Sequence, residues 1–188
     1  MQNDMIIGMI GASGSGKTEI AKNLEKHGYN IIHSYTTREP REKNEWGHTF
    51  VNSKDVEFNK FNNNHMVTFK QHNKKERMIA YVYYNNNHYW ATTQQYLNKG
   101  KSIYIIDPTG FLNLKSWVSI PVIGVLLMAE THSRIDRMNK RGDSNPKIIE
   151  RIKNDKQSFD IIKTDWVINV DCSLSDAILK TKKLLDSF

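Results

Sequence analysis

The 188 residues suit one main domain with small inserted lobes, and 38% hydrophobic and 25% charged residues are ordinary values for a soluble globular protein with a core. No apolar run approaches the about 18 residues of a membrane span. No signal peptide is evident, and a single cysteine excludes an internal disulfide, so we expect a reducing cytoplasm. The formal net charge of +7 is scattered along the chain and is interpreted first as a solvated surface; a basic surface also suits nucleic acid or polyphosphate ligands.

Strands and helices alternate along most of the chain. Apolar runs predict strands at Met5–Ile10, Tyr29–His33, Ser102–Ile106, Ile120–Met128 and Trp166–Val170. Helical periodicity predicts helices at Lys17–His27, Thr131–Lys140, Pro146–Ile162 and from Ser173 to near the C-terminus. This alternation is typical of an α/β fold with a five-stranded parallel sheet and helices on both faces.

Residues 35–91 break that rhythm with aromatic, β-prone runs between Asn-rich turns. We expect an inserted, mostly antiparallel lobe there, with residues 71–84 forming a possible β-hairpin. A small helical lid is expected at residues 134–158. Residues 1–34, 92–133 and 159–188 would then form the core of a single domain.

A glycine-rich loop follows the first strand and opens the first helix. It satisfies the pattern G-x-x-x-x-G-K-[ST] with Gly11, Ala12, Ser13, Gly14, Ser15, Gly16, Lys17 and Thr18. Glycines let backbone N–H groups turn inward around a phosphate, and the helix adds its positive N-terminal end. The pattern therefore predicts an ATP-binding phosphate loop, in which Lys17 reaches the β- and γ-phosphates and Thr18 holds Mg²⁺.

The segment after the second strand resembles the guanylate kinase family. Its residues 34–41 read S-Y-T-T-R-E-P-R and residues 47–51 read G-H-T-F-V, close to the family signature S-x-T-T-R-x-P-R…G-x-x-Y-x-F-V. The resemblance implies that Ser34, Arg38 and Arg41 hold an acceptor monophosphate, because arginine forks match phosphate oxygens. His48 stands where the family has tyrosine, and either binds the phosphate or is a plain surface histidine.

Three further positions concern the acceptor. Tyr89 matches the family's second phosphate-binding tyrosine, and Thr92 or its neighbour Ala91 replaces a Ser/Thr. Thr68 stands where the family has a glutamate that accepts hydrogen bonds from guanine. A threonine does not offer two carboxylate oxygens, so the acceptor base stays open.

The later strands and helices also resemble this family. Asp107 ends a strand beside the phosphate loop and would organise Mg²⁺ through water, contact the acceptor, or simply end the strand. The lid-like pattern R-x-x-x-R-G…R implies that Arg137, Arg141 and Arg151 stabilise the transferred phosphoryl group, whereas Arg134 is either a lid or a surface residue. Asn169 is a candidate for the adenine site, with a turn asparagine as the alternative.

These residues predict a nucleoside monophosphate kinase that transfers the γ-phosphoryl group of MgATP to GMP, dGMP or a related nucleotide. The alternatives are a kinase for another base and a non-catalytic guanylate kinase-like binding module, which the intact phosphate loop and lid arginines disfavour. The expected partners are small nucleotides, without a membrane or nucleic acid, and the chain would be a monomer or a homodimer.

Overall fold

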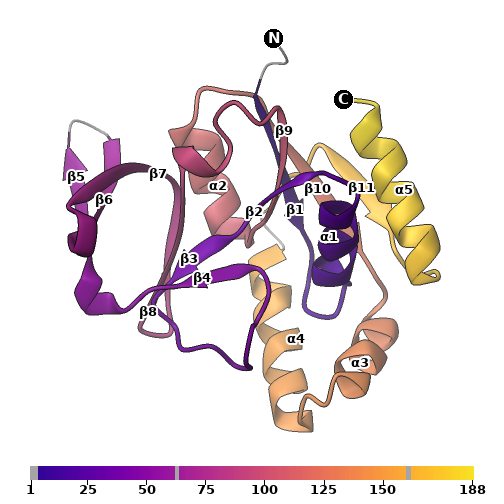
Figure 1. Ribbon diagram of the computed structural model, residues 1–188. Helices are drawn as coiled ribbons and strands as arrows, with labels where there is room; N and C mark the ends of the chain where they lie inside the picture. Colours follow the sequence, from indigo (N-terminus) through magenta and orange to yellow (C-terminus); the bar gives the residue numbers. More distant parts are fainter. Residues whose placement is uncertain (1–3, 62–63, 160–161) are drawn as a thin grey trace. The chain divides into compact units, whose positions relative to one another are not determined.

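The computed structural model describes residues 4–61, 64–159 and 162–188 and has an α/β fold (Figure 1). Its first sheet has the strand order β11-β10-β1-β9-β2. The bounds are β1 Met5–Ile10, β2 Asn30–Ile32, β9 Lys101–Ile105, β10 Val122–Met128 and β11 Trp166–Asn169. Strand β2 pairs in parallel with β9, and β10 with β11. The predicted five-stranded parallel sheet is therefore confirmed.

Five helices accompany this sheet among the described residues. They are α1 Lys17–Lys26, α2 Pro108–Trp117, α3 Thr131–Lys140, α4 Asn145–Phe159 and α5 Leu174–Asp186. Helix α2 was not predicted, because Pro108 and Gly110 are turn-forming residues. Proline is nevertheless well tolerated in the first turn of a helix, and the buried Phe111 and Leu114 anchor this one. The predicted helix to residue 162 ends at Phe159, and residues 160–161 lie outside the described residues.

The second sheet has the order β4-β3-β8-β7-β6-β5. Its strands are β3 Ser34–Thr36, β4 His48–Phe50, β5 Val56–Phe61, β6 Asn64–Phe69, β7 Lys74–Tyr84 and β8 Asn87–Thr92. Only β3 and β4 pair in parallel among these strands, so the predicted mostly antiparallel lobe is confirmed.

The prediction of a β-hairpin within residues 71–84 is wrong. Residues Lys70–His72 form a 3₁₀ turn, and the rest is the single strand β7, which pairs with β6 on one side and β8 on the other. The turn instead lies at Asn85 and Asn86, with φ angles of 47° and 59°. Asparagine tolerates this left-handed conformation better than most residues, so the turn closes β7 onto β8.

The lobe sheet has two chemically different faces. Across β3 and β8, Tyr35 pairs with Trp90 and Thr36 pairs with Tyr89. Because side chains alternate along a strand, Tyr35 and Trp90 share one face while Thr36 and Tyr89 share the other. The Trp90 face carries the lobe's hydrophobic core, whose buried members are Val56, Val67, Met78 and Trp90.

Residue contacts divide the chain into two compact units. The lobe unit contains Met1–Ile6, Asn30–Tyr104 and Thr109–Val122, and the phosphate-loop unit contains Ile7–Tyr29, Ile105–Pro108 and Ile123–Phe188. Within the phosphate-loop unit, α1 packs against α5 (Figure 1). None of the helices in the described ranges is long and apolar enough to cross a membrane.

Candidate nucleotide-binding site

The loop at residues 11–18 connects β1 to α1 in the phosphate-loop unit, as predicted. Gly14 and Gly16 have φ angles of 80° and 90°, in the left-handed region. A Cβ atom at Gly14 would lie 2.6 Å from the carbonyl oxygen of Arg134. Both the backbone conformation and the close contact therefore require glycine at position 14.

Lys17 lies folded into this loop. Its Nζ donates hydrogen bonds to the carbonyl oxygens of Gly11 at 2.6 Å and Ala12 at 3.1 Å. Burial lowers the pKa of Lys17 to about 8; Asp155 opposes the shift, and the nearby guanidinium of Arg134 adds to it. The ammonium group is thus mostly charged at pH 7 and ready to exchange backbone oxygens for phosphate oxygens.

Arg134 and Asp155 clamp the loop at Ser13. Asp155 accepts hydrogen bonds from the Ser13 backbone N–H at 2.9 Å and hydroxyl at 3.3 Å. Buried Arg134 forms an ion pair with Asp155 and donates from Nε to the Ser13 carbonyl oxygen at 2.8 Å. Arg134 is therefore a buried structural residue and not a solvated helix charge. Sequence reasoning missed Asp155, whose contacts span 142 positions.

The three predicted lid arginines differ in their partners: Arg137 contacts backbone oxygens, whereas Arg141 and Arg151 contact a carboxylate. Arg137 donates to the carbonyl oxygens of Val170 at 2.7 Å and Gly14 at 3.4 Å. Arg141 and Arg151 both pair with Asp143, which lies 3.6 Å from the Arg151 guanidinium. The hydrogen bond from Arg141 holds the pKa of Asp143 below its usual range despite burial. Two guanidinium groups thus meet at one carboxylate.

The remaining predicted residues of this unit lie at element ends. Thr18 is exposed in the first turn of α1, and exposed Asp107 follows β9. Exposed Asn169 ends β11, where its side-chain oxygen accepts a hydrogen bond from the Asp171 backbone N–H at 2.8 Å. This last contact is typical of the turn asparagine that the sequence left as an alternative.

The donor set fits a magnesium ion that is held mostly by a nucleotide. In the described part of the chain, no three His, Cys, Asp or Glu side chains cluster closely enough to hold a metal by themselves. Mg²⁺ instead commonly binds substrate phosphates, water and one or two protein oxygens. The Thr18 hydroxyl and the Asp107 carboxylate are oxygens of this kind.

In the lobe unit, Arg38 forms a bidentate ion pair with the carboxylate of Glu45. Its two terminal nitrogens donate to the Glu45 oxygens at 2.7 and 3.1 Å, and the Arg41 backbone N–H donates to the same carboxylate at 2.7 Å. Burial raises the pKa of Glu45, but these hydrogen bonds outweigh burial and leave the pKa below its usual value. Arg38 also lies over the Phe50 ring at 5.4 Å. Sequence reasoning did not single out Glu45.

Ser34, His48 and Tyr89 share the Thr36 face of the lobe sheet. Ser34 pairs across strands with His48, and the rings of His48 and Tyr89 are 6.1 Å apart. The Ser34 hydroxyl donates to the Tyr104 hydroxyl at 3.1 Å. Three of the predicted acceptor residues thus come together on one face.

His48 is neutral at physiological pH. Burial, reinforced by the Arg38 charge, lowers its pKa to about 4. Its Nδ1 is buried and has no hydrogen-bond partner among the described residues. The His48 ring is therefore a neutral polar group on this face and not a positive charge.

This buried histidine predicts a specific pH dependence. Between pH 6.5 and about 4 the unfolded chain binds a proton at His48 that the folded chain does not, so stability falls as the pH falls through this window. We expect a loss of about 3 kcal/mol from this group. Urea unfolding at several pH values should show a shallower loss for His48→Tyr than for the wild type. The exposed His72→Tyr should keep the wild-type slope, and a His48→Tyr slope equal to it would contradict the assignment.

Thr68 and Thr92 are both buried in the lobe unit. Thr68 pairs across strands with Glu57 on β5 and Lys75 on β7. Thr92 ends β8, where its backbone N–H donates to the Gln95 side-chain oxygen at 3.0 Å. A charged residue thus lies on each side of Thr68 in the sheet, one on β5 and one on β7.

Comparison with known families gives a match over most of the chain. A family model described as an AAA domain, AAA_18, matches residues 7–160, which include the phosphate loop and the arginines of α3 and α4. The chain belongs to this AAA domain family. No curated protein matches this AAA-domain chain.

Solved structures support the fold of this AAA-domain chain. Guanylate kinase from Anaplasma phagocytophilum superimposes with a TM-score of 0.59 at 15% identity, covering 100% of this chain and 87% of that one. TT1252 from Thermus thermophilus superimposes with a TM-score of 0.51 at 16% identity, covering 99% and 98%. Identities this low show a shared fold, that of P-loop kinases.

Proposed function

We propose that this chain is an ATP-dependent nucleoside monophosphate kinase. The observation that carries the proposal is a second oxyanion site, separate in sequence from the phosphate loop, in which Arg38 and the Arg41 backbone hold the Glu45 carboxylate. A phosphate monoester offers a larger negative charge and more oxygens to the same donors. An NTPase that uses water as acceptor has no need of such a site.

The donor would be ATP at residues 11–18, and Mg²⁺ held by Thr18 and, through water, by Asp107 would neutralise phosphate charge. Lys17 and the arginines at 137, 141 and 151 are proposed to stabilise charge on the transferred group. For Arg141 and Arg151 this requires exchanging Asp143 for phosphate oxygens. Asn169 is kept as a candidate contact for adenine.

The acceptor would bind through Ser34, Arg38, Arg41, His48 and Tyr89, with Thr68 and Thr92 nearer its base. GMP or dGMP is the first candidate, from the resemblance to guanylate kinases and the fold of the Anaplasma enzyme. A kinase for another base is the second candidate, because Thr68 stands where that family has glutamate.

A panel of ribo- and deoxynucleoside monophosphates with MgATP tests the proposal. We expect one acceptor to be converted to its diphosphate, with ADP formed in equal amount. Phosphorylation of a monophosphate with a base other than guanine would support a kinase and would favour the second candidate. ATP hydrolysis that no monophosphate accelerates would contradict the kinase.

A variant of Arg38 should affect the acceptor alone. Arg38→Ala removes a two-pronged, charge-assisted contact, so we expect KM for the monophosphate to rise at least about tenfold while KM for ATP stays unchanged. Exposed Lys54→Ala, in the same unit, is the matched control and should resemble the wild type. Equal increases in both KM values for Arg38→Ala would argue against an acceptor role.

A further inference from the structure

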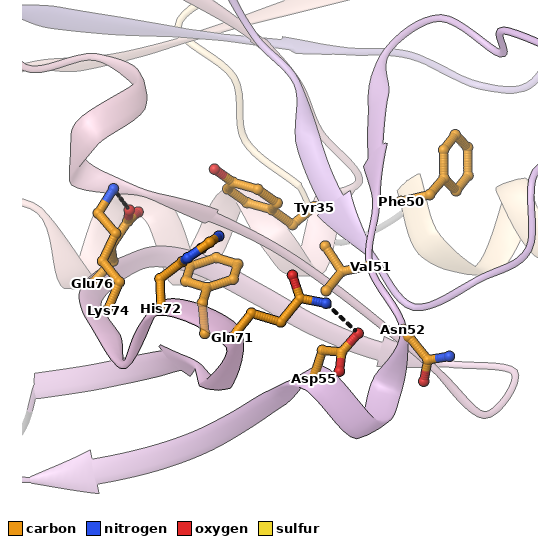
Figure 2. A pocket seen from close by; sticks show the side chains of 10 residues that line it. Tyr35, Phe50, Val51, Asn52, Asp55, Gln71, His72, Lys74 and Glu76 are labelled. Carbon is orange, nitrogen blue, oxygen red and sulfur yellow. Dashed lines mark hydrogen bonds and ion pairs between the residues drawn. The ribbon is translucent and has the colours of Figure 1, made fainter.

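A pocket of about 350 Å³ opens in the lobe unit, between Tyr35, Gln71 and Glu76 (Figure 2). Its walls include the rings of Tyr35 and Phe69, with Phe50 at its edge, and its polar side chains include Gln71, Lys74 and Glu76. The volume is in the range of small-molecule sites in proteins.

Glu76 belongs to the Trp90 face of the sheet. Its cross-strand partner is Val67, and Met78 lies two residues further along β7; both are members of the hydrophobic core on that face. Tyr35 is on the same face, stacked on Trp90 with ring centroids 5.4 Å apart. The predicted phosphate-binding side chains of β3 and β8 point the other way, so this pocket is a separate site.

Glu76 is a buried carboxylate with an unused oxygen. Its side chain is 4% exposed, and Lys74 holds Oε1 at 2.6 Å (Figure 2). Oε2 is buried without a hydrogen-bond partner among the described residues. A carboxylate oxygen deprived of both water and donors is costly, so a native protein seldom keeps one without a reason.

One oxygen of the Glu76 carboxylate is held by the exposed side chain of Lys74. Lys74 is 60% exposed, and a long lysine side chain changes rotamer easily in solvent. When Lys74 swings away, Oε1 also loses the donor that Lys74 supplies. Gln71 is already engaged with Asp55 at 3.2 Å on the other side.

We propose that this pocket binds a planar group with two adjacent N–H donors, which Glu76 accepts while the aromatic walls cover its faces. Guanine and guanidinium groups share this chemistry. Aromatic walls favour flat ligands, and a carboxylate accepts paired N–H groups with both oxygens. The site does not depend on the proposed kinase activity, because Glu76 and Tyr35 lie on the other face of the sheet from Ser34 and Tyr89.

The first test maps binding on the wild-type protein, using backbone amide NMR shifts with guanosine, inosine, adenosine and methylguanidine as probes. We expect guanosine or methylguanidine to shift the amides of Gln71, Lys74 and Glu76. If guanosine is the ligand, inosine, which lacks the exocyclic amine, should bind about tenfold more weakly. Shifts confined to Ser34 and Tyr89, or none with any probe, would overturn the proposal.

The second test measures the same affinities in variants whose folding is checked by circular dichroism. Glu76→Gln keeps the shape but replaces one acceptor oxygen with a donor, so we expect binding to weaken at least about tenfold. Glu57→Gln is the matched control, because Glu57 is an exposed carboxylate facing Thr68 on the other face. Weaker binding by Glu57→Gln together with unchanged binding by Glu76→Gln would overturn the proposal. If Glu76→Gln does not fold, the amide shifts of the wild-type protein decide the question.

Discussion

Replacing Lys17 with alanine should abolish phosphoryl transfer while leaving the fold intact. The Lys17 ammonium is held inside the phosphate loop by two backbone oxygens, and no other side chain of residues 11–18 carries a positive charge. Loss of a cation that stabilises transition-state charge should lower kcat by a factor of at least about 10³. A coupled assay for ADP, run with the best acceptor, measures this.

The control for this variant is Lys26→Ala, an exposed lysine at the other end of the same helix. It should keep wild-type kcat. The far-UV circular dichroism of both variants should match the wild type, because the two bonds lost at Lys17 go to a loop and not to the core. Near-normal turnover by Lys17→Ala would contradict the proposed kinase.

The second large effect is expected at Asp155. Asp155→Asn keeps the size of the side chain but leaves the buried Arg134 without a counter-charge next to Ser13. Removing one partner of a buried pair is strongly destabilising, so we expect the free energy of unfolding to fall by about 3 kcal/mol. The loop should also lose its anchor at Ser13, which should raise KM for ATP.

Urea unfolding followed by circular dichroism measures the stability change. Asp136→Asn, an exposed aspartate on α3, is the matched control and should lie within about 0.5 kcal/mol of the wild type. An Asp155→Asn protein as stable as this control would mean that the clamp at Ser13 does not hold the loop.

Local patterns in the sequence predicted the sheet well because each strand and most helices carry their own signal. The apolar run at residues 5–10 and the loop after it, for example, need no distant partner to be recognised. Helix α2 was not predicted because Pro108 and Gly110 individually favour turns. The helix is stabilised instead by burial of Phe111 and Leu114, which local sequence does not reveal.

The candidate site was less predictable, because its polar contacts join distant segments. Arg38 and Arg41 were found from a motif, but the carboxylate they hold, Glu45, carried no pattern of its own. Asp155 reaches Ser13 across most of the chain, and Glu76 is buried in one continuous strand, β7, where the sequence predicted a hairpin. Such contacts follow from topology and not from spacing.

The turn at Asn85 and Asn86 sets which chemistry each face of the lobe presents. It fixes the register in which Val82 pairs with Tyr89 and Tyr81 with Trp90. A slip of one residue reverses every side chain of a strand. A one-residue insertion or deletion that shifted this register would therefore bring Trp90 in place of Tyr89 onto the Thr36 face. A change in the length of this loop would then alter the proposed acceptor site without any substitution in it.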